Sequence, residues 1–287
     1  MSLKLTKKVT IGYIRASLNI LALVSKKKAA RKAFDLFCTP MHRIKKKEPP
    51  IFEKGQPLSF RQNGHTIRGH RWLPEGTDNQ SRKRVLILHG FESGSANFER
   101  YIGAFLEKGC EVLAFDAPAH GQSGGKQISL PLYTRSIGII YEQFGPIQSF
   151  MAHSFGGLAL SLFLESIPHD AQTRVALIAP ATEMKTAVGF FFRFLRLNQD
   201  IHIEFEELIR ETGGFPSDHY SIRRAMDHIK ASVLWVHDSE DTITPIEDAL
   251  KVEEDHHPNL QFVITKGLGH RKIYRDDKVF EQVVGFL

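Results

Sequence analysis

The chain has 287 residues, of which 42% are hydrophobic, 24% charged and 10% aromatic, and this composition is typical of a folded globular protein. It excludes intrinsic disorder, a collagen-like repeat and a small protein held together by disulfides. The two cysteines, Cys38 and Cys110, are too few for a disulfide framework or a cysteine metal site. We therefore expect a reducing, cytoplasmic compartment.

Positive charge is concentrated near the N-terminus, although the formal net charge of the whole chain is only +6. Residues 1–50 hold 13 Lys and Arg against two acidic residues, a net of +11. The remaining 237 residues hold 25 basic and 30 acidic side chains, a net of −5. Any acidic partner is therefore expected to meet residues 1–50 rather than the rest of the chain.

Residues 1–50 are predicted to form a basic, amphipathic helical extension. Apolar residues recur there at helical spacing: Ile11, Ile14, Leu18 and Leu21. The apolar stretch is shorter than the roughly 20 residues that span a bilayer, and no signal-peptide cleavage site follows it. Two interpretations remain open: residues 1–47 rest on the anionic inner surface of a membrane, or the apolar face packs on the main domain. Nucleic-acid binding is not expected, because no aromatic residues interleave with the charges.

The main domain is predicted to cover residues 51–287, beginning after the helix-breaking pair Pro49-Pro50. A hairpin comes first, in which Leu58–Gln62 and Thr66–Leu73 flank the turn sequence Asn63-Gly64. Beyond the hairpin, short apolar runs without strict alternation predict strands that are covered on both faces. These runs are Arg84–His89, Glu111–Asp116, Gln148–Ala152, Arg174–Ala179, Ser232–His237 and Leu260–Thr265.

Helix-like segments separate most of these apolar runs, and they are Asn97–Lys108, Leu132–Phe144, Gly156–Ile167, Ile246–Glu254 and Asp276–Leu287. Strands that alternate with helices are joined by right-handed crossovers in a parallel sheet. The predicted fold class is therefore α/β, with a mostly parallel, twisted sheet and helices on both faces. Ligands of such sheets bind beyond the carboxyl ends of the strands.

One serine lies at such a strand end. Ser154 stands between the run that ends at Ala152 and a helix predicted to start at Phe155 or Gly156. A serine held at this turn needs small residues two places away, and Ala152 and Gly156 are small. The hydroxyl would then project above the sheet, with a helix N-terminus behind it to favour negative charge. The alternative interpretation is an ordinary helix N-cap.

The strand–turn–helix setting of Ser154 resembles the nucleophile elbow of the α/β-hydrolase family, with Ala152 in place of the usual first glycine. In that family an acid and then a histidine follow the nucleophile along the chain. Asp241, after Ser232–His237, resembles the family's acid position. His270, in Gly267-Leu268-Gly269-His270, resembles the family's Gly-x-Gly-His pattern. The similarity is to serine esterase, lipase and lysophospholipase-like members.

The resemblance implies a role for each of these groups. His270 would take the proton of Ser154 and return it to the leaving group, while Asp241 would orient the imidazole. Backbone amides of Phe155 and Phe91 would bind the oxyanion, the second because His89-Gly90-Phe91 resembles the family's oxyanion turn. The alternative acids are Asp238, Glu240 and Asp116. Among the histidines near these motifs, His89 and His120 are expected to support loop structure, and His153 is not expected to be the base.

The strand–helix alternation lapses at residues of about 182–229, where the family often inserts a short helical lid. Phe190, Phe191 and Phe194 lie in this interval, as candidate contacts for a lipophilic acyl or aromatic substrate or as packing residues of the lid. The predicted function is hydrolysis of a small-molecule carboxylic ester in lipid metabolism, without metal or cofactor. Thioester hydrolysis and acyl transfer remain alternatives, as does a non-catalytic binding module, and the oligomeric state stays open.

Overall fold

The computed structural model describes residues 5–43, 48–76 and 82–287 of the chain. The chain divides into two compact units. The sheet unit comprises Pro40–Thr182 and Ser221–Leu287, and the helical unit comprises Met1–Thr39 and Glu183–Tyr220. The segments expected to form an N-terminal extension and a lid thus contribute to the same unit, although about 140 residues separate them along the chain. Residues 1–4 and 44–47 of the expected extension lie outside the described part.

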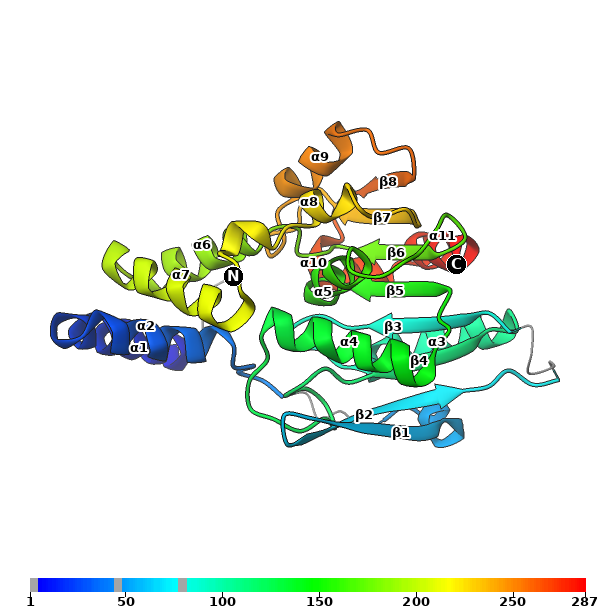
Figure 1. Ribbon diagram of the computed structural model, residues 1–287, viewed down its shortest axis with the longest axis horizontal. Coiled ribbons are helices and arrows are strands. Elements are labelled where there is room, and N and C mark those ends of the chain that lie inside the picture. Colours follow the sequence, from blue (N-terminus) through cyan, green and yellow to red (C-terminus); the bar gives the residue numbers. More distant parts are fainter. Residues whose placement is uncertain (1–4, 44–47, 77–81) are drawn as a thin grey trace. The chain divides into compact units, whose positions relative to one another are not determined.

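The sheet unit is built on an eight-stranded sheet with the order β1-β2-β4-β3-β5-β6-β7-β8. From β4 onward in this order, each strand pairs in parallel with the next one. Strand β2 is antiparallel to both β1 and β4 (Figure 1). The predicted mostly parallel α/β fold is therefore confirmed. The strands are β1 Gln56–Gln62, β2 His65–Trp72, β3 Arg84–Leu88, β4 Glu111–Phe115, β5 Ser149–His153, β6 Arg174–Ile178, β7 Ser232–Asp238 and β8 Leu260–Thr265.

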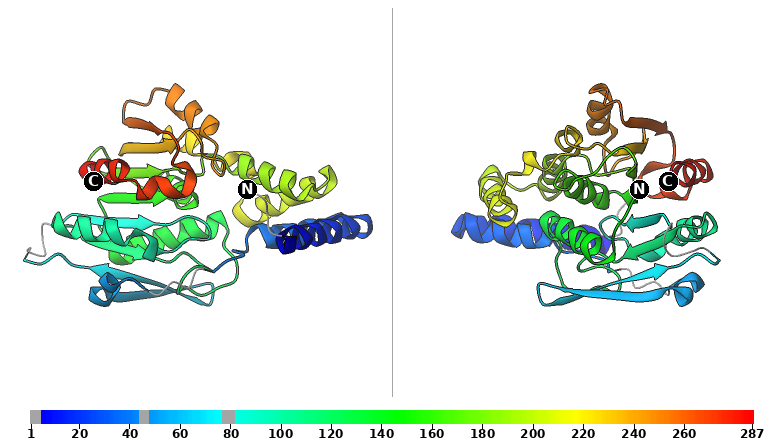
Figure 2. Two further views of the ribbon diagram at one scale, coloured as in Figure 1. Left: turned by 180° about the vertical axis from the view of Figure 1, so that it is seen from behind. Right: turned by 45° about the vertical axis from the view of Figure 1, so that its right-hand side comes forward.

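Helices cover both faces of this sheet. In Figures 1 and 2, α4, α5, α8 and α9 lie on one face and α3 and α11 on the other. The bounds are α3 Glu99–Glu107, α4 Leu130–Phe144, α5 Phe155–Leu164, α8 Ile222–Met226, α9 Ile246–Glu254, α10 Gly269–Lys272 and α11 Asp277–Phe286, with 3-10 turns at Pro50–Lys54, Ser95–Phe98 and Ile273–Arg275. Because both faces are covered, every residue of the central strands β4 and β5 is buried.

The hairpin between β1 and β2 turns at Asn63 and Gly64, whose φ angles are 47° and 77°. Two consecutive positive φ values match the tight turn that an Asn-Gly pair favours. The hairpin extends the parallel sheet at one edge, while β8 forms the opposite edge and has no fully buried residue. In sheets of this kind, ligands bind beyond the carboxyl ends of the parallel strands.

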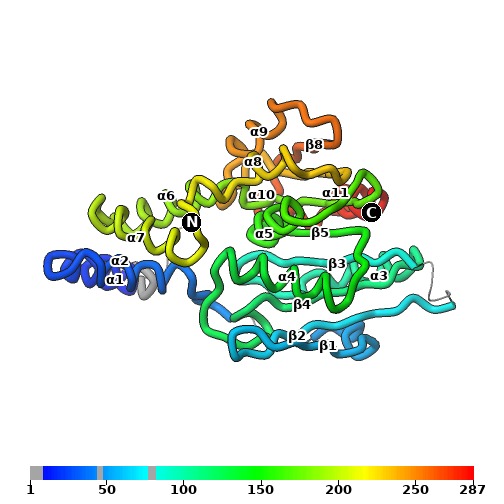
Figure 3. Tube along the Cα trace, viewed as in Figure 1, coloured from blue at the N-terminus to red at the C-terminus, as the bar shows by residue number. Residues whose placement is uncertain are grey.

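The helical unit contains α1 Leu5–Val24, α2 Lys26–Phe37, α6 Met184–Leu195 and α7 Gln199–Gly213, with a 3-10 turn at Ser217–His219. The Cα trace in Figure 3 shows α1 and α2 running beside each other. Phenylalanine rings join α2 to α7, since the rings of Phe34 and Phe37 lie 5.4 and 5.6 Å from that of Phe205. In the described part of the chain, no helix is both long and apolar enough to cross a membrane.

Candidate active site

Ser154 lies at a sharp turn between β5 and α5. Its φ of 55° and ψ of −123° are rare for an L-residue, so the surrounding contacts must hold the strained backbone in place. The amide of Ser154 donates to the carbonyl of Ile178 at 3.1 Å, and its carbonyl accepts from the amides of Gly157 and Ala181 at 2.9 and 3.0 Å. The turn that was expected from the sequence is thus hydrogen-bonded to the end of β6 and to the loop that follows it.

Gly156 has no room for a side chain, because a Cβ there would lie 2.6 Å from the carbonyl oxygen of His89. We expect Gly156→Ala to push the loop after β3 away from the turn and to lower the free energy of unfolding by about 1–3 kcal/mol. Chemical denaturation measures this change. Gly285→Ala in α11 is the matched control, since a Cβ at Gly285 meets nothing within 4 Å. Equal stability of the two variants would contradict the prediction.

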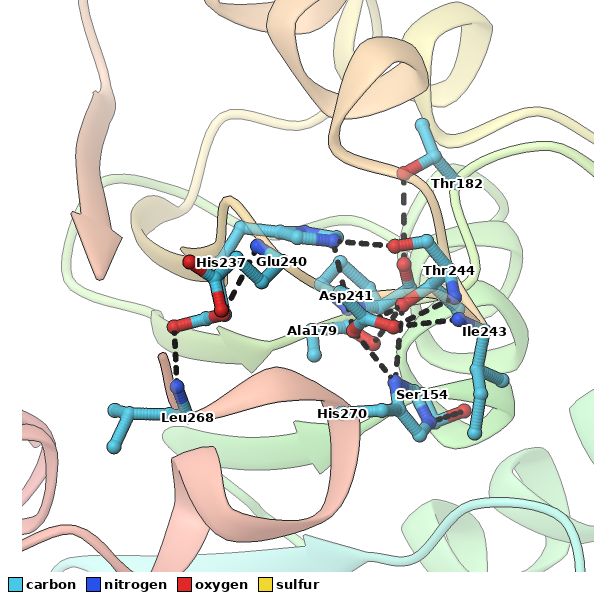
Figure 4. A network of polar contacts seen from close by, with 12 residues as sticks. Ser154, Ala179, Thr182, His237, Glu240, Asp241, Ile243, Thr244, Leu268 and His270 are labelled. Carbon is cyan, nitrogen blue, oxygen red and sulfur yellow. Dashed lines mark hydrogen bonds and ion pairs between the residues drawn. The ribbon is translucent and has the colours of Figure 1, made fainter. Parts of the chain in front are cut away.

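Ser154, His270 and Asp241 form one line of contacts (Figure 4). His270 Nε2 lies 2.9 Å from Ser154 Oγ, and His270 Nδ1 lies 2.8 Å from Asp241 Oδ2. All three side chains are buried, with exposed fractions of 7%, 9% and 6%. A neutral imidazole that donates from Nδ1 to a carboxylate presents its Nε2 lone pair to the hydroxyl, which is the geometry a general base needs.

Asp241 is held as a carboxylate. Its Oδ1 accepts hydrogen bonds from the amides of Ile243 and Thr244 at 2.8 and 3.0 Å. Burial by itself would raise the pKa of Asp241, but the hydrogen bond and charge of His270 and these two amides lower it to about 2. The group opposite His270 Nδ1 is therefore negatively charged throughout the neutral range.

Thr244 is a site residue that sequence reasoning missed. Its Oγ1 donates to Asp241 Oδ2 at 2.8 Å and lies 3.1 Å from His270 Nδ1. The Thr244 carbonyl accepts a hydrogen bond from the Nε2 of buried His237 at 2.8 Å. A usable signal was the spacing Asp-x-x-Thr directly before Pro245, because an aspartate often accepts from amides two and three residues later. Thr244 thus orients the carboxylate and the imidazole together.

Two of the alternative acids, Asp238 and Asp116, hydrogen-bond to groups other than His270. Asp238 Oδ2 accepts from Thr265 Oγ1 at 2.7 Å and from the amide of Leu268 at 3.1 Å, which anchors the loop ahead of His270. Asp116 Oδ1 accepts from the amide and hydroxyl of Ser95, both at 2.9 Å. Glu240 is exposed. Among the four acids weighed from the sequence, Asp241 is the one whose carboxylate contacts His270.

The two amides predicted to be oxyanion donors are those of Phe155 and Phe91, and their role stays a prediction. The amide of Phe155 belongs to the first turn of α5, where helix amides have no partner within the helix. The amide of Phe91 shares a peptide group with the Gly90 carbonyl, and His89 Nδ1 donates to that carbonyl at 2.8 Å. Because His89 Nε2 accepts from the amide of Ala117 at 2.8 Å, the ring is fixed at both nitrogens. His89 therefore sets the orientation of the Gly90–Phe91 peptide, in keeping with the loop role expected for it.

His120 supports the same loop, as was also expected. Its Nε2 accepts from the amide of Glu92 at 3.0 Å, and its Nδ1 donates to the carbonyl of Pro118 at 2.9 Å. Burial and then the neighbouring His89 lower the pKa of His120 to about 4, so the ring is neutral. Glu92 in turn accepts from the amides of Met41 and His42 at 2.9 and 3.2 Å.

His153 directly precedes Ser154 in the sequence, and its side chain hydrogen-bonds to the backbone of His270. Its Nε2 donates to the carbonyl of His270 at 3.1 Å, and the two rings lie 4.8 Å apart. Burial, followed by repulsion from His270, lowers the pKa of His153 from 6.5 to about 3. The ring is therefore neutral, and the contact of its Nε2 is with the backbone carbonyl of His270.

The lowered pKa of His153 predicts a loss of stability in acid. The unfolded chain takes up this proton below about pH 6.5, whereas the folded protein does so only near pH 3. Stability must therefore fall as the pH drops through this window, by up to about 1.4 kcal/mol per pH unit for this one group. We expect His153→Gln to flatten the fall in unfolding free energy between about pH 6 and 4 by that amount. Urea titrations measure it, with exposed His228→Gln as the control; equal slopes would contradict the prediction.

The three phenylalanines predicted to contact substrate lie on α6 in the helical unit. Phe191 packs between the rings of Phe37 and Phe205, at 5.2 and 5.9 Å, so it contributes to the core of that unit. Phe190 and Phe194 are exposed, and their contact with substrate stays a prediction. Within the described ranges, no group of three or more His, Cys, Asp or Glu residues is arranged to hold a metal ion.

Comparisons with known proteins identify related sequences. Residues 79–205, less than half of the chain, match the family described as serine aminopeptidase, S33. The uncharacterised protein YqkD of Bacillus subtilis strain 168 is 23% identical over 219 residues, covering 67% of this chain and 64% of that protein. A serine hydrolase-like protein of Dictyostelium discoideum is 27% identical over 197 residues, covering 65% and 50%. This chain thus spans less than two thirds of either relative.

The fold itself is found among solved structures. The Pyrococcus furiosus esterase Pf2001 superposes with a TM-score of 0.63 at 19% sequence identity, covering 86% of this chain and 97% of that one. A putative lipase of Acinetobacter baumannii gives a TM-score of 0.58 at 17% identity, covering 81% and 90%. At such identities the likeness establishes the architecture, which agrees with the sheet order and the turn at Ser154. The chain therefore has the α/β-hydrolase fold.

Proposed function

We propose that the protein is a serine hydrolase that cleaves a carboxylic ester with a lipophilic acyl or aromatic group, through an acyl-enzyme. The observation that carries this proposal is the continuous line of contacts Ser154–His270–Asp241, at 2.9 and 2.8 Å. A helix N-cap would need none of these partners, and α5 has no side-chain cap from Ser154.

In the first half-reaction, Ser154 Oγ attacks the ester carbonyl carbon while His270 Nε2 accepts the hydroxyl proton. The carbonyl oxygen becomes an oxyanion that accepts hydrogen bonds from the amides of Phe91 and Phe155, a contribution of about 3 kcal/mol for each donor. The tetrahedral intermediate then loses its alkoxy group, which takes the proton from His270 Nε2 and departs as the alcohol. The acyl group remains on Ser154.

In the second half-reaction, a water molecule attacks the acyl carbon and gives its proton to His270 Nε2. The new intermediate collapses, the bond to Ser154 Oγ breaks, and His270 returns the proton to the serine. The products are a carboxylic acid and the free enzyme. Throughout both halves Asp241, with its pKa lowered to about 2, stays ionised and stabilises the imidazolium.

Support for a lipophilic substrate comes from apolar side chains that stay exposed next to the reacting groups. The Phe91 ring is 37% exposed and meets the Phe155 ring edge-on at 6.1 Å. Ile243 follows two residues after Asp241 and is 49% exposed. Apolar surface beside polar reacting groups is typical of sites for small organic ligands. Longer acyl chains are therefore expected to react faster than acetate.

Labelling with a fluorophosphonate probe, followed by a panel of substrates, tests the proposal. Labelling of the intact protein but not of Ser154→Ala would support an activated serine. Faster turnover of p-nitrophenyl esters than of the matching thioesters or of amino-acid p-nitroanilides would support an ester substrate. Preference for thioesters would favour the thioesterase alternative, and preference for anilides would favour the peptidase chemistry named by the matched family. Folded protein without labelling or turnover would favour a binding module.

A further inference from the structure

The outward face of α1 is apolar. Five large side chains on it are exposed by between 63% and 86%: Val9, Tyr13, Ile20, Leu23 and Val24. On a helix that turns by about 100° per residue, these positions and exposed Ala16 fall within an arc of about 100°. No charged residue falls within that arc between Val9 and Val24. We call these six residues the α1 stripe.

The α1 stripe is not the face that folds the helical unit. The opposite side of α1 carries Leu18 and Ala22, which are 1% and 8% exposed, and α1 packs against α2 and α6. Arg15, the one charged residue between Val9 and Val24, points its guanidinium to the carbonyls of Phe194 and Leu195, at 3.0 and 3.1 Å. This cation at the C-terminus of α6 is favourable, and it leaves the stripe free of charge. An exposed apolar surface of this kind marks an interaction site.

The helix next to α1 carries exposed basic side chains. Lys27, Lys28 and Lys32 are exposed on α2, which runs beside α1 (Figure 1). The first acidic residue of the chain is Asp35, so α1 carries no carboxylate, while Asp200 and Glu211 of α7 pair with Lys26 and Arg31. In a symmetric dimer joined through this surface, the lysines of the two copies would face each other and repel. An anionic lipid surface would instead attract them, by about 1 kcal/mol for each lysine near the headgroups.

We propose that the α1 stripe docks the protein on the surface of an anionic phospholipid bilayer, with α1 lying in the membrane plane. A helix of 20 residues is about 30 Å long, and its apolar side chains would enter the boundary between headgroups and acyl chains. The lysines of α2 would contact the headgroup phosphates. This proposal does not depend on the chemistry proposed for Ser154. Of the two interpretations of residues 1–47, it corresponds to the one in which they rest on an anionic membrane surface.

Vesicle sedimentation of the full-length protein tests this proposal. We expect binding to phosphatidylcholine vesicles that contain phosphatidylglycerol, and weaker binding to phosphatidylcholine alone or at high salt. Ile20→Glu combined with Leu23→Glu should lower the partition coefficient by about tenfold or more, because two side chains that enter the bilayer become charged. Ile264→Glu is the matched control, since Ile264 is 50% exposed on the edge strand β8. It should bind as the wild type does.

A charge-reversal variant separates the electrostatic contribution of the α2 lysines to membrane binding from the apolar contribution of the α1 stripe. Lys27→Glu combined with Lys28→Glu should weaken binding to anionic vesicles while leaving the weak binding to neutral vesicles unchanged. Circular dichroism checks that each variant is folded. Three results would overturn the proposal: a wild-type protein that stays in the supernatant, a stripe variant that sediments like the wild type, or a stripe that instead holds a dimer, seen as a mass that halves in the stripe variant without any vesicle binding.

Discussion

Ser154→Ala and His270→Ala are each expected to lower kcat/KM for an ester by about five to six orders of magnitude, and the double variant should be no slower than either. The reason is the 2.9 Å contact between Ser154 Oγ and His270 Nε2. Without the imidazole the hydroxyl keeps its proton, and without the hydroxyl the imidazole has nothing to activate. Each loss therefore removes the whole nucleophile.

Steady-state kinetics of the two single variants and the double variant measure this coupling. Additive losses, in which the double variant is slower by the product of the two factors, would contradict a shared role. Ser161→Ala is a suitable control, because Ser161 is also buried on α5 but its hydroxyl donates to the carbonyl of Gly157 at 2.9 Å. This variant is expected to keep most of the activity, which would show that loss of a buried hydroxyl near the turn is not enough.

The sheet and its order of reactive groups were predictable because both depend on local patterns. Each parallel strand is a short apolar run, so the residue after each run lies at the same edge of the sheet. Ser154, Asp241 and His270 follow β5, β7 and β8 in this way, and the structure brings them into contact. Boundaries differ by one to three residues, because helix and strand ends are the least defined parts of either pattern.

The pairing of the N-terminal helices with residues 183–220 was not predictable in the same way. Periodicity identifies the apolar side of α1 and α2, but it does not identify which distant helix covers that side. The second apolar face of α1 was missed for a related reason. A search for one amphipathic face finds Ile11, Ile14, Leu18 and Leu21. The exposed α1 stripe lies on the other side of the same helix.

Thr244 and His153 were missed as supports because their roles arise from contacts between elements. Thr244 reaches His270 across 26 positions of sequence, and His153 reaches the carbonyl of His270 across 117. No single strand or helix pattern contains both members of either pair. The predicted site therefore named the three side chains that the structure brings into contact and omitted the residues that hydrogen-bond to them.

Asp241→Asn is expected to lower kcat by about four orders of magnitude while KM changes little. The carboxylate accepts the Nδ1 proton of His270 at 2.8 Å, and its other hydrogen-bond donors are the amides of Ile243 and Thr244 and the hydroxyl of Thr244. An asparagine there can turn its NH₂ toward His270 Nδ1, which then becomes an acceptor. The Nε2 would carry the proton instead, and the imidazole could no longer receive one from Ser154.

The pH dependence strengthens this test. The pKa of Asp241 is lowered to about 2, so the wild-type carboxylate stays ionised as the pH falls and its protonation cannot account for any loss of rate above about pH 4. The Asn variant should therefore be slow across the whole neutral range rather than at one end of it. Glu240→Gln removes a carboxylate one residue away that is exposed, and it should leave kcat unchanged. If Asp241→Asn kept a tenth or more of the wild-type kcat, Asp241 would not be the group that sets the tautomer of His270.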